Sequence, residues 1–160
     1  ALMGNTGQIF ACDVHEHKIK LMHKTFNRLG VTNVVPQLID ARRIKDHVKK
    51  QAFDYVLADL PCSGIGVMGH KVDLKHRLTK QNIDDIILLQ QQILDTTYDL
   101  VKVGGYYVMS TCTINKDENQ NQIARFLKRY PMFIIEKEII LLPFEHHTDG
   151  FYICKMRRMR

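Results

Sequence analysis

Residues 53–66 read FDYVLADLPCSGIG, an apolar run that leads into a loop of small residues. The apolar half predicts a buried β-strand. Pro61 restricts the backbone on either side of it, and Gly64 permits a sharp turn that a ligand can approach closely. We therefore expect a strand that delivers Asp59 and Cys62 to a tight loop at its carboxyl end.

Strand signals of this kind alternate with helical periodicity along the rest of the chain. Strands are predicted at residues 8–12, 34–39, 53–58, 106–110, 133–140 and 151–156. Helices are predicted at residues 15–29, 42–50 and 116–130, and from an N-cap at Asn82 to Gly104-Gly105, with a basic loop at residues 67–81. This order predicts βαβ units, and therefore an α/β fold with a mostly parallel sheet that carries helices on both faces.

Aspartate and cysteine residues, which can take part in binding or catalysis, closely follow several predicted strands. Asp13, Asp40 and Asp59 come directly after three of them. Cys62 and Cys112 lie a short loop beyond two strands. Because ligands of such folds bind beyond the carboxyl ends of the strands, we expect these five side chains to collect at the functional edge of the sheet.

Asp13 and Asp40 each have two interpretations. An acid between a strand and a helix can accept hydrogen bonds from ribose hydroxyls, or it can cap the helix that follows. Asp40 could equally face its neighbour Arg42. The chain contains no glycine-rich phosphate loop, which disfavours dehydrogenases and P-loop enzymes.

Composition excludes several classes of protein. The chain has 160 residues, 45% hydrophobic and 25% charged, which favours one globular domain. It contains no apolar run of about 18 residues and no secretory signal, so we expect no membrane span. The cysteines are widely spaced, which disfavours a metal site or a disulfide framework and predicts reduced thiols in a cytoplasmic protein: Cys12, Cys62, Cys112 and Cys154.

The charge balance points to a polyanionic partner. Lys and Arg number 23 and Asp and Glu number 17, which gives a net charge of +6. The basic residues gather in three stretches: Arg42, Arg43, Lys45, Lys49 and Lys50; Lys71, Lys75, Arg77 and Lys80; and Lys155, Arg157, Arg158 and Arg160. One such stretch is usually a solvated face, but three together favour a nucleic-acid partner, because basic patches bind phosphates.

Cys62 and Cys112 are candidates for covalent catalysis. Each could be structural, either in a simple turn or as a buried free cysteine. However, a thiol in a loop such as residues 59–66 is partly exposed, and a thiol that precedes a helix is near backbone donors that favour the thiolate. Two such cysteines with an acid beside them indicate nucleophilic catalysis assisted by that acid.

Two motifs resemble a known family. DLPCSGIG at residues 59–66 and STCT at residues 110–113 resemble the signature motifs of the Sun/Fmu (RsmB-type) RNA 5-methylcytosine methyltransferases. Other segments also resemble the family and occur in the family's order: residues 5–13, 72–75, 89–90, 103–105, 117–119 and 149–152. The resemblance therefore covers essentially the whole chain. The chain departs from the family pattern at positions outside the chemistry: Leu60, Ile65, Val72 and Tyr152.

The resemblance implies a fold, a reaction and a role for each candidate residue. The fold is the class I S-adenosylmethionine-dependent (Rossmann-like) fold, and the reaction is methylation of cytosine C5 in RNA, with 16S-type ribosomal RNA as the commonest target. Cys112 is implied to be the nucleophile that adds to C6 of the base, and Cys62 to assist proton removal and release of the adduct. Asp59 is implied to contact the cytosine edge. Asp13, Asp40 and Asp59 match cofactor-contacting acids, with Asp13 on the ribose and Asp40 on the adenine side.

The resemblance also implies missing parts. In the family, a glycine-rich cofactor loop, a first strand and most of a first helix precede the segment that resembles residues 1–4. We therefore expect residues 1–160 to be a truncated catalytic domain without the N-terminal RNA-binding region and the first βα unit, and a monomer in its full-length form. Without that loop we expect weak or no cofactor binding, and a missing central strand would expose a sheet edge.

Three alternatives remain open. In a DNA cytosine-C5 methyltransferase, Cys62 rather than Cys112 would be the nucleophile. A non-catalytic RNA-binding module would use only the basic stretches and would need neither cysteine. An amino-group methyltransferase would carry an aromatic residue near Pro61, where this chain has Cys62.

Overall fold

The structure, a computed structural model, describes residues 2–69 and 78–160. The chain forms two compact units, with the boundary between His47 and Val48. The predicted basic loop at residues 67–81 falls largely on residues 70–77, which lie outside the described residues. Lys71, Lys75 and Arg77 are among these residues.

The first unit contains a two-stranded parallel sheet of β1 (Ile9–Asp13) and β2 (Val34–Leu38). Helix α1 (Glu16–Leu29) connects the two strands and ends at Gly30, whose left-handed φ of 64° suits glycine. The basic helix predicted next is a 3-10 helix, η1 (Ala41–Asp46). This unit is therefore the βαβ arrangement that the sequence predicts.

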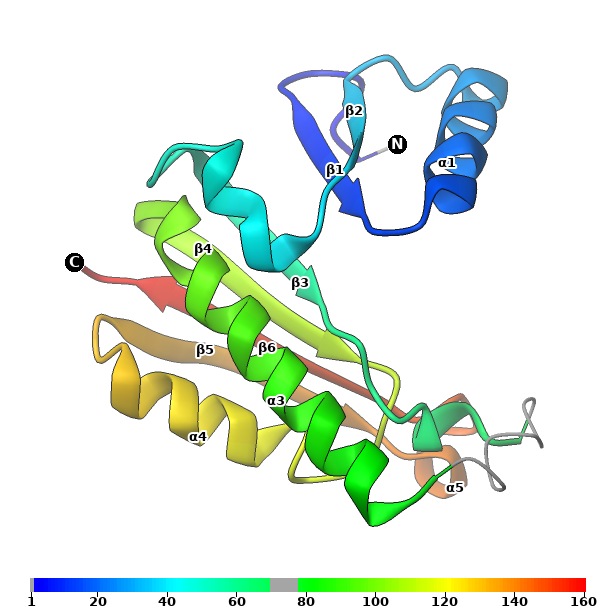
Figure 1. Cartoon of the computed structure of the whole chain (residues 1–160), viewed down its shortest axis with the longest axis vertical. Coiled ribbons are helices and arrows are strands. Elements are labelled where there is room, and N and C mark those ends of the chain that lie inside the picture. Colours follow the sequence, from blue (N-terminus) through cyan, green and yellow to red (C-terminus); the bar gives the residue numbers. More distant parts are fainter. Residues whose placement is uncertain (1, 70–77) are drawn as a thin grey trace. The chain divides into compact units, whose positions relative to one another are not determined.

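The second unit contains a four-stranded sheet with the order β3-β4-β6-β5 (Figure 1). Its strands are β3 (Phe53–Asp59), β4 (Val101–Thr111), β5 (Phe133–Leu141) and β6 (Phe151–Arg158). Its helical segments are η2 (Ile65–Val67), α3 (Lys80–Thr97), η3 (Tyr98–Leu100), α4 (Gln120–Arg129) and α5 (Pro143–His146). Side chains from the sheet and from α3 and α4 form the core, among them Leu94, Tyr107, Met109, Phe126 and Tyr152.

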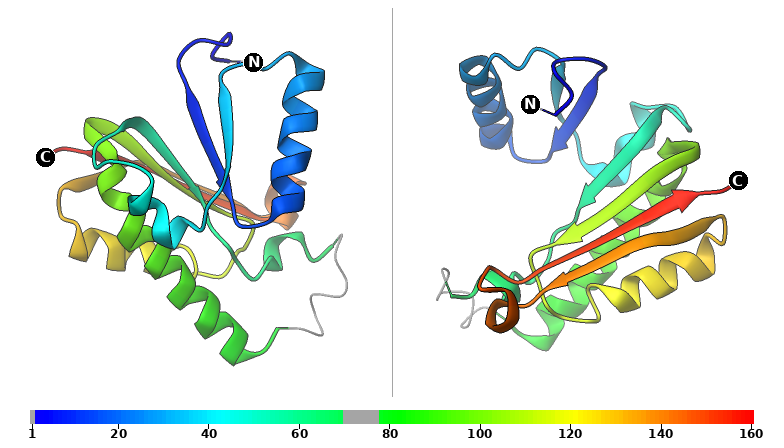
Figure 2. Two further views of the ribbon diagram at one scale, coloured as in Figure 1. Left: turned by 45° about the horizontal axis from the view of Figure 1, so that its top comes forward. Right: turned by 180° about the vertical axis from the view of Figure 1, so that it is seen from behind.

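The sheet of the second unit differs from the predicted one in two respects. Only β3 and β4 are parallel neighbours, because β6 runs antiparallel to both β4 and β5. Helices α3 and α4 both lie on the same face of this sheet (Figure 2). The chain crosses from β3 to β4 and from β4 to β5 in the same direction, and right-handed crossovers in one direction place their helices on one face.

Two element boundaries also differ from the predicted ones. Gly104-Gly105, the predicted end of the long helix, lies inside β4. A Cβ at Gly105 would lie 2.6 Å from the carbonyl oxygen of Asp54, so glycine lets β4 approach β3 closely at an irregularity in their register. The N-cap of α3 is Thr79, whose hydroxyl accepts a hydrogen bond from the Asn82 N–H, and not Asn82 itself.

Candidate active site

The loops that carry the two cysteine motifs lie side by side in the second unit. They follow β3 and β4, parallel neighbours in which Asp59 pairs with Ser110, so both loops start at the same sheet edge. The Leu60 N–H donates to the Ser110 carbonyl at 2.9 Å, and the Gly66 N–H donates to the Cys112 carbonyl at 3.2 Å. Backbone hydrogen bonds thus join the loops at both ends.

The two thiols meet between these loops. Cys62 and Cys112 are half-buried, and their Sγ atoms are 3.1 Å apart. Burial, and then the neighbouring Cys112 thiol, raise the pKa of Cys62 to about 12. Cys62 is therefore a neutral thiol at neutral pH, and a neutral thiol is poorly suited to nucleophilic attack.

Asp59 completes the group at this edge. Its exposed carboxylate accepts a hydrogen bond of 2.8 Å from the Ser110 hydroxyl, which holds it beside the second cysteine motif. The structure therefore brings together three of the five predicted site residues, Asp59, Cys62 and Cys112. A carboxylate next to two thiols can accept hydrogen bonds from the ring or amino N–H groups of a base that binds at the thiols.

Sequence reasoning missed the polar residues behind the thiols. The backbone N–H and the hydroxyl of Ser63 donate to the two carboxylate oxygens of Glu118, at 2.7 and 2.6 Å. Both residues are buried. In the sequence, Glu118 and Asn119 stand out only as part of the family-like segment 117–119, since an acid–amide pair just before a helix is ordinarily exposed. Their proximity to the motif at residues 59–66 depends on the packing of α4.

A concave surface borders the first cysteine motif. A cavity of about 460 Å³ is lined by Gly66, Gly69, Pro143, His147, Thr148 and Asp149. Gly66 closes one wall by backbone contact, since the Gly150 N–H donates to the Gly66 carbonyl at 2.8 Å. A volume of this size falls in the range of small-molecule sites, about 300–1,000 Å³.

Asp13 lies in the first unit, at the carboxyl end of β1. Its carboxylate accepts hydrogen bonds from the His15 N–H at 2.8 Å and from Lys18 Nζ at 3.1 Å. Burial alone would raise the pKa of Asp13, but the hydrogen bonds from His15 and Lys18 outweigh it, so the pKa lies below the ordinary value. An ionised carboxylate in this position is a good acceptor for hydroxyl groups.

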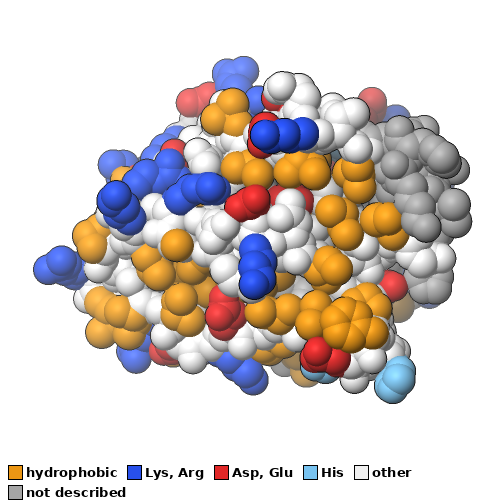
Figure 3. Space-filling model, turned by 90° about the horizontal axis from the view of Figure 1, so that it is seen from below, with side chains coloured by type: hydrophobic (Ala, Val, Ile, Leu, Met, Phe, Trp, Pro, Cys, Tyr) orange, Lys and Arg blue, Asp and Glu red, His pale blue; other side chains and the backbone are white. Residues whose placement is uncertain are grey.

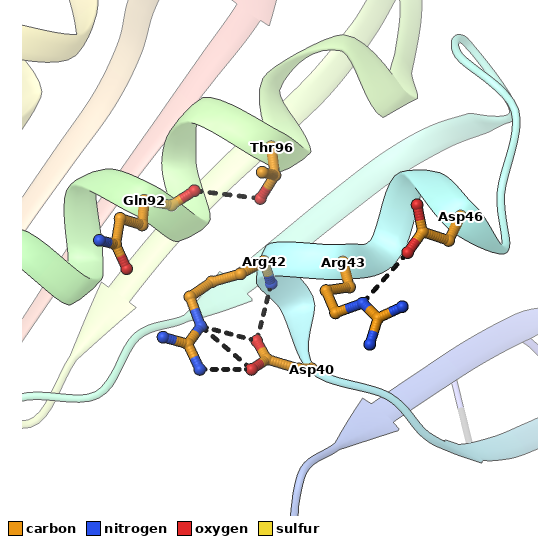
Figure 4. Close-up of polar contacts among 6 residues, drawn as sticks. All are labelled: Asp40, Arg42, Arg43, Asp46, Gln92 and Thr96. Carbon is orange, nitrogen blue, oxygen red and sulfur yellow. Dashed lines mark hydrogen bonds and ion pairs between the residues drawn. The ribbon is translucent and has the colours of Figure 1, made fainter.

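Asp40 follows β2 at the same edge of the two-stranded sheet, where the Ile39 N–H donates to the Asp13 carbonyl. Its carboxylate caps η1 through the Arg42 N–H and also forms an ion pair with the Arg42 guanidinium (Figure 4). The hydrogen bond from the Arg42 side chain lowers the pKa of Asp40 below its ordinary value. Of the interpretations weighed for Asp40, the cap and the Arg42 contact are both observed.

The basic stretches have different structural roles. Arg158 is buried and donates to the Val101 carbonyl at 2.8 Å, while Lys155 and Arg157 flank Glu136. On the face drawn in Figure 3, Lys and Arg side chains lie among hydrophobic and acidic ones. Among residues 2–69 and 78–160, no helix is long and apolar enough to cross a membrane. In that same part of the chain, no three His, Cys, Asp or Glu side chains cluster as metal ligands do.

Comparison with known proteins identifies the family. The model of the 16S rRNA methyltransferase RsmB/F family matches residues 1–157. The chain is 34% identical over 174 residues to the probable ribosomal RNA small subunit methyltransferase B of Bacillus subtilis. The alignment covers 98% of this chain and 39% of that protein. It is 32% identical over 187 residues to the 25S rRNA (cytosine-C(5))-methyltransferase nop2 of Schizosaccharomyces pombe. That alignment covers 99% of this chain and 31% of the relative.

The fold has a counterpart of similar sequence among solved structures. The crystal structure of NSun6 from Pyrococcus horikoshii with SFG matches with a TM-score of 0.87 at 27% identity, over 99% of this chain and 43% of that one. The α/β fold is thus the class I methyltransferase fold that the motifs predict. The chain spans about two fifths of the length of the Bacillus relative, 39%. Over that length, it belongs to the RsmB/F family of 16S rRNA methyltransferases.

Proposed function

We propose that this chain is the catalytic part of an enzyme that methylates C5 of cytosine in RNA with S-adenosylmethionine. The observation that carries the proposal is the 3.1 Å separation of the Cys62 and Cys112 sulfurs, with Asp59 at the same strand edge. Neutral cytosine is a poor nucleophile at C5, so a reaction there needs covalent activation at C6, which a cysteine can supply.

In this proposal Cys112 is the nucleophile. Its Sγ forms a bond to C6 as the Cys112 proton passes, by way of the Asp59 carboxylate, to the ring nitrogen. The C5–C6 double bond is thereby replaced by an enamine that is electron-rich at C5. S-adenosylmethionine, when bound, supplies the methyl group. After methyl transfer, Cys62 passes its proton to Cys112 Sγ as the Sγ–C6 bond breaks and takes the C5 proton in exchange. The proton on the ring nitrogen leaves by way of Asp59 to solvent. The raised pKa of Cys62 supports the choice of Cys112 as nucleophile, because a thiol that stays protonated is a poor nucleophile.

Asp13 and Asp40 are the proposed cofactor contacts of the first unit. The Asp13 side chain keeps 19% of its surface exposed at the carboxyl end of β1, where a carboxylate fits ribose hydroxyls. Asp40 would approach the adenine side while it remains paired with Arg42.

The proposed substrate is ribosomal RNA of the 16S type, and the proposed location is the cytoplasm, with the full-length protein a monomer. The Bacillus relative, a probable ribosomal RNA small subunit methyltransferase, and the Schizosaccharomyces relative, a 25S rRNA (cytosine-C(5))-methyltransferase, support this substrate class. The net charge of +6 is consistent with an RNA partner. A base in a stacked or paired RNA would have to be extruded to reach the thiols.

The test uses the full-length protein that carries this chain, with Cys112→Ala and Cys62→Ala made separately. Cys112→Ala should abolish methyl transfer from labelled S-adenosylmethionine to RNA. Cys62→Ala should accumulate a covalent RNA adduct that survives denaturing electrophoresis. Cys12→Ala, a half-buried cysteine of the first unit, is the matched control and should retain turnover.

Two outcomes would reject this proposal. An adduct trapped by Cys112→Ala and abolished by Cys62→Ala would indicate the DNA-type assignment of the nucleophile. Salt-sensitive RNA binding that neither substitution changes, without methyl transfer by the unsubstituted protein, would indicate a binding module.

A further inference from the structure

Glu118 joins the two cysteine loops through a buried contact. Its carboxylate accepts the N–H and the hydroxyl of Ser63, the residue after Cys62. The Ser63 hydroxyl is also 2.9 Å from the Thr113 hydroxyl, on the residue after Cys112. Glu118 is 0% exposed, so one buried carboxylate, just before α4, is connected to the residue that follows each thiol.

Asn119 holds both flanks of Cys112. Its side-chain oxygen accepts from the Thr111 hydroxyl at 2.5 Å, and its Nδ2 donates to the Thr113 carbonyl at 2.8 Å. Asn119 is 1% exposed. The residues before and after Cys112 are therefore tied to a single side chain, which limits how the backbone of that loop can turn.

A second buried amide holds the other flank of Cys62. Gln90 on α3 donates to the Pro61 carbonyl at 2.9 Å, and Gln122 on α4 donates to Gln90 Oε1 at 2.9 Å. Both amides are 0% exposed. Cys62 therefore lies between Pro61, held from α3, and Ser63, held from the start of α4.

These contacts indicate that the buried polar side chains position the cysteine loops and do not only stabilise the core. Burial of a carboxylate and of amide groups is unfavourable unless each is well paired, and apolar side chains of similar size often serve a core as well. In this core Glu118, Asn119 and Gln90 bond to residues directly beside Cys62 or Cys112, and Gln122 holds Gln90. Such networks rigidify the groups that they contact.

We propose that Glu118 and Asn119 are positioning residues that set the separation and orientation of the Cys62 and Cys112 thiols. The proposal rests on the proposed function in one respect: the thiols must act together on one base. In the proposed methyl transfer, one thiol attacks C6 and the other exchanges protons next to it. The rate therefore depends on how the two thiols are placed relative to each other. A displacement of about 1 Å at such a site can lower the rate by about a hundredfold.

The test compares Glu118→Gln and Asn119→Asp with matched controls in the full-length protein. Glu118→Gln puts an amide donor against the Ser63 donors, and Asn119→Asp removes the donor to the Thr113 carbonyl. Asp117→Asn and Asn121→Asp make the same chemical changes at exposed neighbours on either side. Circular dichroism at the assay temperature confirms that each protein is folded.

The first readout is independent of catalysis. Dibromobimane becomes fluorescent when it joins two nearby thiols, and peptide mass spectrometry identifies the Cys62–Cys112 product. We expect Glu118→Gln and Asn119→Asp to lower the rate of this cross-link by about tenfold or more, while Asp117→Asn and Asn121→Asp leave it unchanged. Cross-linking at the unsubstituted rate in both folded variants would overturn the proposal.

The second readout separates positioning from general destabilisation. We expect kcat for methyl transfer to fall by about tenfold or more while KM for S-adenosylmethionine stays within about twofold, because Glu118 and Asn119 bond to Ser63, Thr111 and Thr113 rather than to the proposed cofactor acids. An equal fall in kcat for the exposed controls would contradict the proposal. If the unsubstituted protein transfers no methyl group, the proposed function fails, and the cross-link still decides whether these residues position the thiols.

A milder substitution covers the case in which Glu118→Gln does not fold. Ser63→Ala removes the hydroxyl contact with Glu118 but keeps the backbone contact. It should lower the Cys62–Cys112 cross-linking rate in a folded protein, and no change in that rate would count against the proposal. In a folded Glu118→Gln protein, the effects of Ser63→Ala and Glu118→Gln should not add, because both break the same contact.

Discussion

Cys62 should remain a thiol under conditions in which an ordinary cysteine ionises. Its raised pKa, about 12 against an ordinary 9.0, reduces the thiolate fraction at any pH below that value. Because iodoacetamide reacts with the thiolate, the logarithm of the labelling rate at Cys62 should keep rising with unit slope through about pH 10. The same cysteine in the urea-unfolded chain is the control, and its rate should level off near pH 9. Labelling that levels off at the same pH in both states would contradict the raised pKa.

At the scale of elements, η2 packs against the loop that leads into β6 without space for a side chain. A Cβ at Gly66 would lie 2.7 Å from the carbonyl carbon of Gly150 and would overlap its oxygen. Gly66→Ala should therefore separate the two segments and lower the free energy of unfolding by about 1–3 kcal/mol, measured by urea denaturation. Gly69→Ala is the control, since a Cβ there meets no atom of residues 2–69 and 78–160 within 4 Å, and it should change stability little. Equal stability of the two variants would refute the close packing of Gly66.

At the scale of the whole molecule, the two units should differ in local stability. The first unit has a two-stranded sheet, and α1 contains no buried residue. In the second unit β4 lies between β3 and β6 and carries core residues such as Tyr107 and Met109. Two strands alone are marginally stable, so hydrogen exchange should show amides of β4 protected at least about tenfold more than those of β1 and β2. Uniform protection across β1, β2 and β4 would contradict this expectation.

Sequence patterns predicted the shared edge of Asp59, Cys62 and Cys112 because strand ends are local features and parallel neighbours align their carboxyl ends. The same local reasoning failed at Gly104-Gly105. A glycine pair is a common helix stop, but here the closeness of β4 to Asp54 requires glycine inside a strand. That requirement arises from pairing between segments far apart in the chain, so no local pattern contains it.

The polar residues behind the thiols were missed for the same reason. Glu118 and Gln90 belong to residue types that are usually exposed, and their burial depends on how α3 and α4 pack against the loops. The handedness of the crossovers, which places both helices on one face, made those contacts available. Local sequence therefore could not identify the side chains that hold Pro61 and Ser63.

The sequence alone established the alternation of strands and helices, the two cysteine motifs and the family. These depend on short-range periodicity and on the order of motifs along the chain. The tertiary structure decided the 3.1 Å approach of the two sulfurs, the division into two sheets and the buried contacts of Glu118. The physical reason is the range of the interactions. Backbone propensities and turn chemistry act over a few neighbouring residues, whereas sheet pairing and the burial of polar groups depend on segments that meet only in the folded chain.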